Sequence, residues 1–287
     1  MNGFRSKFVV ALVGVGLLAG CAQAGTTPAP AATWQAGVAP HSPSAKPKPA
    51  TKPKPKPRAS TAPGSTPPES TPPGSTPPGS TPHFGGPAGS MTRTGGSGVA
   101  LTFDDGPDPV QTPRILDLLA EYHVRATFCL VGRNVEAYPE LVRRIVAGGH
   151  TLCNHSWQHS LTLGKQSPDA IRADLQRTND AIHAAAPGAK IAYLRAPGGN
   201  FTPAYVQVAT AMGMKSIYWQ VDPRDWDHPA GESSSAHRAK VIAAVETHTR
   251  KGSIVLSHDY GQPDTIAAYQ TLIPWLQARF HLIALGQ

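Results

Sequence analysis

The stretch that decides the fold of this chain is Val99-Ala100-Leu101-Thr102-Phe103-Asp104-Asp105-Gly106-Pro107. Its first five residues are apolar or β-branched, which predicts a buried strand. Two adjacent carboxylates and a Gly-Pro turn follow that strand directly. A plain turn would account for the Asp-Gly pair by itself. The function of the pair therefore depends on which other residues the fold brings to the same place.

From Gly98 onward, short apolar strands alternate with amphipathic helices, a pattern that predicts a parallel sheet covered by helices. Two folds fit this alternation, a barrel and an open doubly wound sheet, and the region is shorter than the roughly 250 residues of an eight-fold barrel. We expect strands at Val99–Phe103, Ala126–Leu130, His150–Cys153, Ile191–Arg195, Lys215–Trp219, Ser253–Ser257 and Phe280–Ala284. We expect helices from Pro113 and at Tyr138–Ala147, Pro168–Ala185, Pro203–Met212, Ser235–His248 and Asp264–Ala278.

Residues 1–20 have the features of a bacterial export signal. Basic residues precede an apolar core, Phe8–Leu18, that is too short to span a bilayer as a stable helix. Leu18-Ala19-Gly20-Cys21 follows, and it looks like a lipobox, in which the signal peptide is removed and Cys21 carries the lipid. The alternative is an ordinary secretory peptide that is cut at a nearby small residue, such as after Ala24. We favour the lipoprotein because the cysteine stands where the apolar core ends.

Residues 21–97 are expected to be a lipidated cysteine followed by a disordered tether. Residues 22–97 contain 18 of the 30 prolines, in Lys-Pro alternation and in a Ser-Thr-Pro-Pro repeat. Such a segment cannot bury enough surface to offset its ordering entropy and favours an extended polyproline II spacer.

The charge of the chain is concentrated in its N-terminal third. Residues 1–97 hold nine of the 26 Lys and Arg residues but only one of the 18 acidic residues, so the remaining chain is neutral. A neutral folded region argues against nucleic-acid binding. The basic part is instead suited to contact with anionic lipids or wall polymers.

Five motifs stand at or just after the carboxyl ends of the expected strands, where barrel enzymes place their chemistry. They are Thr102–Pro107, His155-Ser156-Trp157-Gln158-His159, Arg195-Ala196-Pro197-Gly198-Gly199, Asp222-Pro223-Arg224-Asp225-Trp226 and Leu256-Ser257-His258. In this order they resemble the motifs of the NodB-type polysaccharide deacetylases (carbohydrate esterase family four). The resemblance covers roughly residues 98–287, which it identifies as a NodB homology domain. It implies a distorted (β/α)7 barrel and a hydrolase that removes N-acetyl groups.

Two histidines and one carboxylate make a catalytic metal triad with positions left open for water. His155 and His159 are four residues apart, so a helical turn would place them on one face. In the family, the position that matches Asp105 binds the metal too, and the position that matches Asp104 is the general base. An N2O ligand set suits zinc best, and cobalt or nickel would also fit. We expect one divalent metal and no organic cofactor.

The resemblance assigns acid and base chemistry to residues at the other strand ends. Arg195 is expected to orient the general base and to keep it ionised. His258 is expected to be the general acid, with its proton affinity raised by Asp225.

Three further residues are expected to contact the substrate. Trp226 and Leu256 would enclose the acetyl methyl group. Where the family has Pro followed by an aromatic residue, this chain has Pro197 and Gly198. The Gly198 N–H is still present for the oxyanion, but the missing ring removes one wall of the groove.

The lipid anchor and the tether favour the cell's own envelope glycan as substrate. N-acetylglucosamine or N-acetylmuramic acid of peptidoglycan comes first, and chitin-like oligosaccharides are related substrates. We expect an exported monomer that is anchored in the cell membrane and faces the wall or periplasm. One alternative is an O-deacetylase of acetylated xylan or another polysaccharide. The other is an inactive wall-binding lipoprotein on a barrel without activity, and the presence of all the matched polar residues speaks against it.

Cys129 and Cys153 are expected to lie in buried core strands, where a free cysteine behaves as a small hydrophobic residue. In an exported protein the two could pair. A disulfide between neighbouring strands is geometrically demanding, and the sequence does not decide between the two states.

Overall fold

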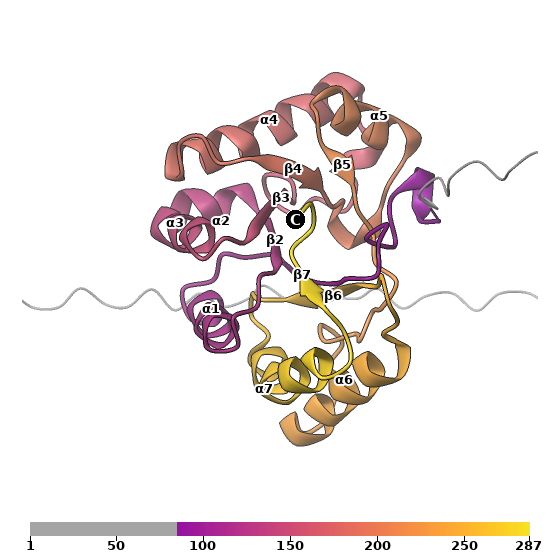
Figure 1. The fold of residues 1–287 in the computed structure, drawn as a ribbon. Coiled ribbons are helices and arrows are strands. Elements are labelled where there is room, and N and C mark those ends of the chain that lie inside the picture. The colour runs from indigo at the N-terminus through magenta and orange to yellow at the C-terminus, as the bar shows by residue number, and fades with distance from the viewer. Residues whose placement is uncertain (1–84) are drawn as a thin grey trace, which may run out of the picture. The chain divides into compact units, whose positions relative to one another are not determined.

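The computed structural model describes residues 85–287. Within them, seven parallel strands form one curled sheet with helices around its outside, so the expected distorted barrel is confirmed as a half-open barrel (Figure 1). The strands are β1 (Val99–Asp104), β2 (Thr127–Leu130), β3 (Thr151–Asn154), β4 (Ile191–Leu194), β5 (Lys215–Ser216), β6 (Ile254–His258) and β7 (Leu282–Ile283). Their order is β5-β4-β3-β2-β1-β6, and β7 pairs with the start of β1. The expected export signal, Cys21 and most of the expected tether lie outside the described residues.

The helices of this region match the expected ones closely where a capping residue marks their start. Ser167 accepts a hydrogen bond from the Ala170 N–H at the start of α4, and Ser233 caps α6 in the same way. The helices are α1 (Gln111–Glu121), α2 (Gly132–Ala137), α3 (Pro139–Ala147), α4 (Pro168–Ala185), α5 (Pro203–Ala211), α6 (Ser234–His248) and α7 (Pro263–Gln277). Between Gly85 and Gln287 none of them is both long and apolar enough to cross a membrane.

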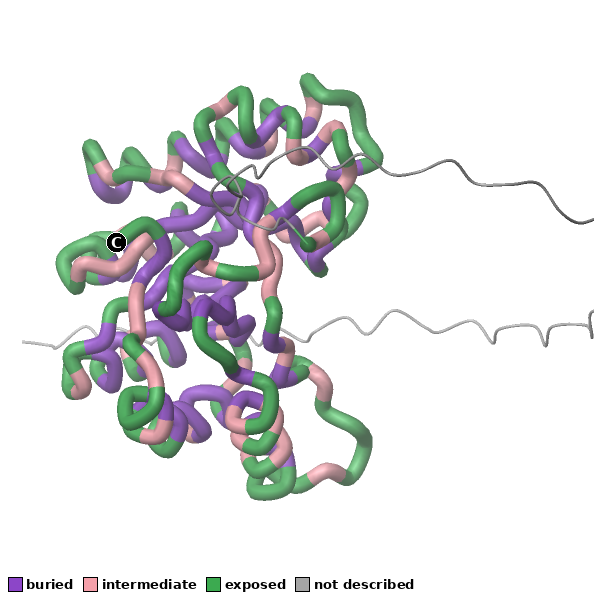
Figure 2. The backbone as a smooth tube through the Cα atoms, turned by 45° about the vertical axis from the view of Figure 1, so that its right-hand side comes forward, coloured by how far each residue is buried: buried purple, intermediate pink, exposed green. Residues whose placement is uncertain are grey.

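The core lies between the strands and the helices. Every residue of β1 is buried, as expected for a strand that has neighbours on both edges and helices outside it. The Phe103 ring packs against Phe128 and Tyr269, with ring centroids 5.3 and 5.1 Å apart. Figure 2 shows the buried residues gathered along the strands and the exposed residues on the outer turns of the helices. This packing fixes β1, and with it the two carboxylates that follow.

The ordered domain begins before the boundary that the sequence predicted. We expected the tether to reach residue 97, but residues 85–97 contact the domain. Met91 pairs with Ile217, just after β5, and Arg93 pairs with Ser253, just before β6. Because β5 and β6 are the two ends of the strand order, this segment spans the open side of the half-barrel. The sequence pattern missed it because its few apolar residues have no periodicity.

Cys129 and Cys153 lie in buried strands, as expected, and the structure joins them in a disulfide. The two residues are direct partners in the register of β2 and β3, and their Cα atoms are 4.1 Å apart. This contact settles a question that the spacing of the cysteines left open.

Candidate active site

A cavity of about 430 Å³ opens at the carboxyl ends of the strands. All five motifs contribute to its lining, together with side chains that the sequence analysis did not single out. The lining residues are Asp104, Asp105, His155, His159, Leu161, Gly198, Gly199, Asn200, Trp219, Asp222, Trp226, Leu256 and His258. Arg195 and Asp225 are fully buried behind this surface.

The three expected metal ligands converge on one point of the cavity. Asp105 Oδ1 lies 3.3 Å from His155 Nε2 and 3.2 Å from His159 Nε2. Ligand atoms around a tetrahedral zinc lie about 3.4 Å apart, because each is roughly 2.1 Å from the ion. Asp105 Oδ1 is buried without a hydrogen-bond partner among the described residues. The group therefore fits a divalent metal.

Hydrogen bonding and charge prepare these ligands for a cation. His155 Nδ1 lies 2.7 Å from the Arg195 carbonyl oxygen, and donation there leaves the Nε2 lone pair free toward Asp105. Burial alone would raise the pKa of Asp105, but the neighbouring His155 lowers it well below its usual range. Burial and the charge of His155 lower the pKa of His159, which favours the neutral, ligating form.

The two histidines do not share a helical turn, so that part of the prediction is wrong. Residues 155–159 are not helical, with bends at Trp157 and Gln158, and Ser156 and His159 have left-handed backbone angles, with φ of 63° and 58°. Asp105 is left-handed as well, with φ of 75°. Non-glycine residues in this conformation are strained and cluster at functional sites. With these backbone angles, the side chains of Asp105, His155 and His159 converge without a helical turn.

Arg195 and Asp104 form a buried ion pair beside the metal ligands. One Arg195 nitrogen donates to Asp104 Oδ1 at 2.7 Å and to Thr102 Oγ1 at 2.8 Å, and the other donates to the Tyr218 carbonyl at 2.9 Å. The second carboxylate oxygen of Asp104 lies 3.7 Å from His155 Nε2. One oxygen is therefore fixed by the arginine, and the other faces the ligand cluster.

His258 is held by Asp225 through two contacts. Asp225 Oδ1 lies 2.9 Å from His258 Nδ1, and Oδ2 accepts from the His258 backbone N–H at 2.8 Å. Thr265 donates to the same carboxylate at 2.8 Å. Burial alone would lower the pKa of His258, but the Asp225 carboxylate raises it to about 9. The imidazole is therefore protonated at neutral pH.

The wall that Gly198 appeared to remove is supplied by other residues. Leu161 is 53 % exposed and lies against Gly198, where a Cβ would come within 3.0 Å of it. Trp219 stacks on Tyr218 with ring centroids 3.8 Å apart and lies under Gly199. Trp219 could have been suspected from the sequence, because it is an aromatic residue at the end of an expected strand. Leu161 belongs to none of the five motifs, so nothing in the sequence pointed to it.

The expected oxyanion and methyl-pocket residues also lie at the cavity. Gly198 has φ of 60°, and its N–H donates to no protein oxygen within residues 85–287. Trp226 is 45 % exposed, whereas Leu256 is buried at the base of the cavity. Their positions place a free donor and two apolar surfaces around the same space.

Sequence reasoning missed Asp259, which directly follows His258. Its side chain is fully buried against Gly106, and its backbone N–H donates to the Asp104 carbonyl. Burial and the charges of Asp105 and Asp104 raise its pKa to about 7, although a hydrogen bond from Thr112 opposes the shift. The Asp259 carboxyl group is therefore close enough to the two site carboxylates for their charges to act on it.

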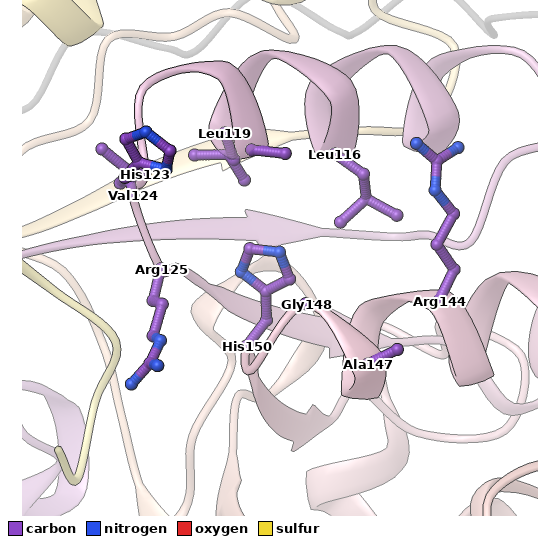
Figure 3. A pocket seen from close by; sticks show the side chains of 10 residues that line it. Leu116, Leu119, His123, Val124, Arg125, Arg144, Ala147, Gly148 and His150 are labelled. Carbon is purple, nitrogen blue, oxygen red and sulfur yellow. The ribbon is translucent and has the colours of Figure 1, made fainter.

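A second hollow, of about 470 Å³, lies at the opposite, amino-terminal edge of the strands between α1 and α3. Figure 3 shows His150 beneath α1, with Arg125 and Arg144 on either side of it in this view. Burial and the charge of Arg125 lower the pKa of His150 to about 4. Among residues 85–287 no carboxylate lines this hollow, and none of the five motifs reaches it.

Comparison with known proteins places the chain among deacetylases. The family model described as polysaccharide deacetylase matches residues 92–217, which include the first three motifs. A chitooligosaccharide deacetylase of Sinorhizobium fredii is 38% identical over 197 residues, 64% of this chain and 88% of its own length. A peptidoglycan-N-acetylglucosamine deacetylase of Bacillus cereus is 35% identical over 183 residues, 62% of this chain and 81% of its own. The structure of a CE4 family pseudoenzyme from Bacillus anthracis superposes with a TM-score of 0.60 at 30% identity, covering 68% of this chain and 66% of that one.

Proposed function

The chain belongs to the polysaccharide deacetylase family, and we propose that it is a metal-dependent hydrolase that removes N-acetyl groups from an envelope glycan. The proposed substrate is N-acetylglucosamine or N-acetylmuramic acid of peptidoglycan, or a chitin-like oligosaccharide. Relatives that are named for chitooligosaccharides and for peptidoglycan N-acetylglucosamine support this class of substrate.

One observation carries the proposal. Three parts converge on a single cavity: the metal-ligand set, an acidic residue held by a buried arginine, and a histidine held by a buried aspartate. Each part alone has structural explanations. Together they supply an electrophile site, a general base and a general acid on different sides of one space, which is the arrangement that amide hydrolysis requires.

The proposed mechanism begins with attack on the acetyl carbonyl. Asp105, His155 and His159 would hold a divalent metal, zinc being the best match, and this Lewis acid would polarise the carbonyl and lower the pKa of water. Asp104 takes the proton of the attacking water at its free oxygen, while Arg195 keeps the carboxylate oriented and ionised.

The departing amine is then protonated. The Gly198 N–H donates to the oxyanion that forms as water adds to the carbonyl carbon. His258 gives a proton to the amide nitrogen as the C–N bond breaks, and Asp225 keeps its imidazole protonated beforehand. The products are acetate and a free amino sugar.

Acetate release tests this proposal. The zinc-loaded full-length protein is incubated separately with chitooligosaccharides, peptidoglycan and acetylated xylan, and muropeptides are analysed by mass spectrometry for the loss of acetyl groups. We expect acetate from the first two substrates. Asp104→Asn serves as the control for contaminating activity. Turnover confined to xylan would instead favour the O-deacetylase, whose better leaving group depends less on His258.

An inactive chain is the remaining alternative, because a CE4 pseudoenzyme shares this fold. The positions discussed above carry the full set of polar residues, which favours an active enzyme. A protein that binds stoichiometric zinc but releases no acetate from any of the three glycans would favour the inactive reading.

We also propose that the mature protein is exported and carries a lipid on Cys21. The motivation is Leu18-Ala19-Gly20-Cys21 at the end of an apolar core. Fractionation of cells with and without Cys21→Ser tests the anchor, since the variant should leave the membrane fraction. A wild-type protein that is soluble and lacks a modified cysteine would contradict it.

A further inference from the structure

A second group of metal-ligating side chains lies outside the cavity, where the loop after Asp225 meets the start of α6. His228 and Glu232 lie in this loop, and His237 lies in the first turn of the helix. One nitrogen from each histidine and one carboxylate oxygen of Glu232 lie within 4.8 Å of one another. The two imidazole rings face each other with centroids 3.8 Å apart.

His237 is the residue that points to a ligand. Its side chain is 1% exposed, and neither of its ring nitrogens has a hydrogen-bond partner among the described residues. Buried polar groups nearly always have a partner, and an orphan one calls for a water or an ion. The nearest carboxylate oxygen, Asp264 Oδ2, lies 3.5 Å from Nδ1, beyond a normal hydrogen bond. The position of His237 at the start of a helix does not explain why its imidazole is buried with both nitrogens lacking a hydrogen-bond partner among the described residues.

The surrounding residues orient the group as metal ligands are usually oriented. His228 Nε2 lies 2.7 Å from Gln262 Oε1, and donation to this amide oxygen leaves the lone pair on Nδ1. Glu232 contacts Lys240 through Oε2 at 3.1 Å, so its other oxygen remains available.

The fourth candidate ligand, Asp264, is held in a similar way. Its Oδ1 is 3.3 Å from an Arg238 nitrogen, while its Oδ2 faces His237. In both Glu232 and Asp264, one carboxylate oxygen thus contacts a basic side chain, and the other oxygen is available to a further partner. The two cations also limit the negative charge that would otherwise accumulate at this place.

We propose that His228, Glu232 and His237, with Asp264 as fourth ligand, bind a divalent transition-metal cation. Two imidazoles and two carboxylates suit zinc, which takes four nitrogen and oxygen ligands tetrahedrally. Ligand atoms on such an ion lie about 3.4 Å apart. The group must therefore contract around the ion, and His228 can move toward it because it is exposed and lies in a loop.

A cation here would connect the loop to the starts of α6 and α7. The same loop carries Asp225 and Trp226 at its beginning, and Asp264 is next to Thr265, which donates to Asp225. The site would therefore hold in place the segment that positions Asp225. No residue of the site lines the catalytic cavity, so its occupancy is separable from that of the first site.

Zinc binding to full-length protein tests the proposal independently of catalysis. The protein is stripped with a chelator and titrated with zinc by calorimetry, with metal content measured after dialysis. We expect two equivalents in the wild type and one in His155→Ala/His159→Ala, which lacks the first site. Adding His228→Ala, a change at an exposed loop residue, should remove the remaining equivalent. His248→Ala is the matched control, because it removes an exposed histidine from the other end of the same helix.

Cobalt gives a second readout that a merely misfolded variant would not reproduce. The first-site variant should show the visible absorption of tetrahedral cobalt, and zinc should raise its melting temperature. Both effects should vanish in the variant with His228→Ala and weaken with Glu232→Gln. The proposal is overturned if the first-site variant binds no zinc, or if its zinc persists unchanged after His228→Ala.

Discussion

The carboxylate of Asp225 contacts His258 twice, through the ring nitrogen Nδ1 at 2.9 Å and through the backbone N–H at 2.8 Å. The contact with Nδ1 stabilises the imidazolium, and the contact with the N–H holds the His258 backbone in position. Because the pKa of His258 is raised to about 9, the proton is present below that pH and is lost as the pH rises through it. The basic limb of the activity profile should therefore report this one pair.

Asp225→Asn should move that limb to lower pH. The amide keeps much of the shape of the carboxylate but removes its charge, so burial then lowers the pKa of His258 against only the smaller effects of Asp105 and Asp104. We expect kcat/KM to fall at a lower pH than in the wild type. The measurement is a full pH profile of both proteins with a soluble chitooligosaccharide, and an unchanged basic limb would show that another group titrates there.

Asp104→Asn should keep its metal and lose its activity. The residue is not one of the three proposed ligands, and a general base contributes about 10²–10⁴ in turnover. Metal content and acetate release are measured on the same sample. Asp105→Asn is the comparison, because it should lose metal as well. If Asp104→Asn loses its zinc, the roles of the two adjacent carboxylates have been exchanged.

His258→Ala should affect amides more than activated esters. The amine that leaves an amide needs a proton, whereas a good leaving group departs without one. We expect turnover of an N-acetyl sugar to fall by about 10²–10⁴ and that of an activated acetyl ester to change much less. Equal losses on both substrates would assign His258 to structure or to metal binding.

The start of the domain can be located by truncation. A chain that begins at Gly85 should fold and turn over soluble substrate like the full-length protein. One that begins at Gly98 loses the backbone pairs of Met91 with Ser216 and Tyr218, and of Thr94 with Gly252. At about 1 kcal/mol each, their loss should lower the melting temperature by roughly 5–15 °C. Calorimetry on both proteins decides this, and equal stability would mean that residues 85–97 contribute nothing.

Much of the fold followed from local signals in the sequence. The bounds of α4 match the prediction because Ser167-Pro168 is a strong helix start, and β1 matches because its apolar run is continuous. The helix α2 was missed because six residues that begin with glycine carry no helical periodicity. The residues at a strand end could thus be predicted wherever a continuous apolar run marked the strand.

The sequence predicted which residues form the site better than it predicted how they are arranged. The spacing of His155 and His159 suggested a helical turn, but the left-handed backbone of Ser156 depends on tertiary contacts that no spacing encodes. Leu161 and Trp219 form a wall only because loops from different strands meet. The Cys129–Cys153 pair likewise depended on the register of two strands rather than on sequence.

The segment that spans the open side of the half-barrel also has a mechanical meaning. Tension on the chain before Gly85 would act on the contacts of residues 85–97 with the domain, which include the bond that the Met91 carbonyl accepts from the Tyr218 N–H. Tyr218 stacks on Trp219, which lines the cavity, so a load would reach one flank of the groove. Asp104 lies on β1, next to the edge strand β6, and Arg195, which holds its carboxylate, donates to the Tyr218 carbonyl. Stretching should therefore disturb the flank of the groove and the Arg195–Asp104 pair together, and force spectroscopy with a bound oligosaccharide would detect the first of these effects as early ligand release.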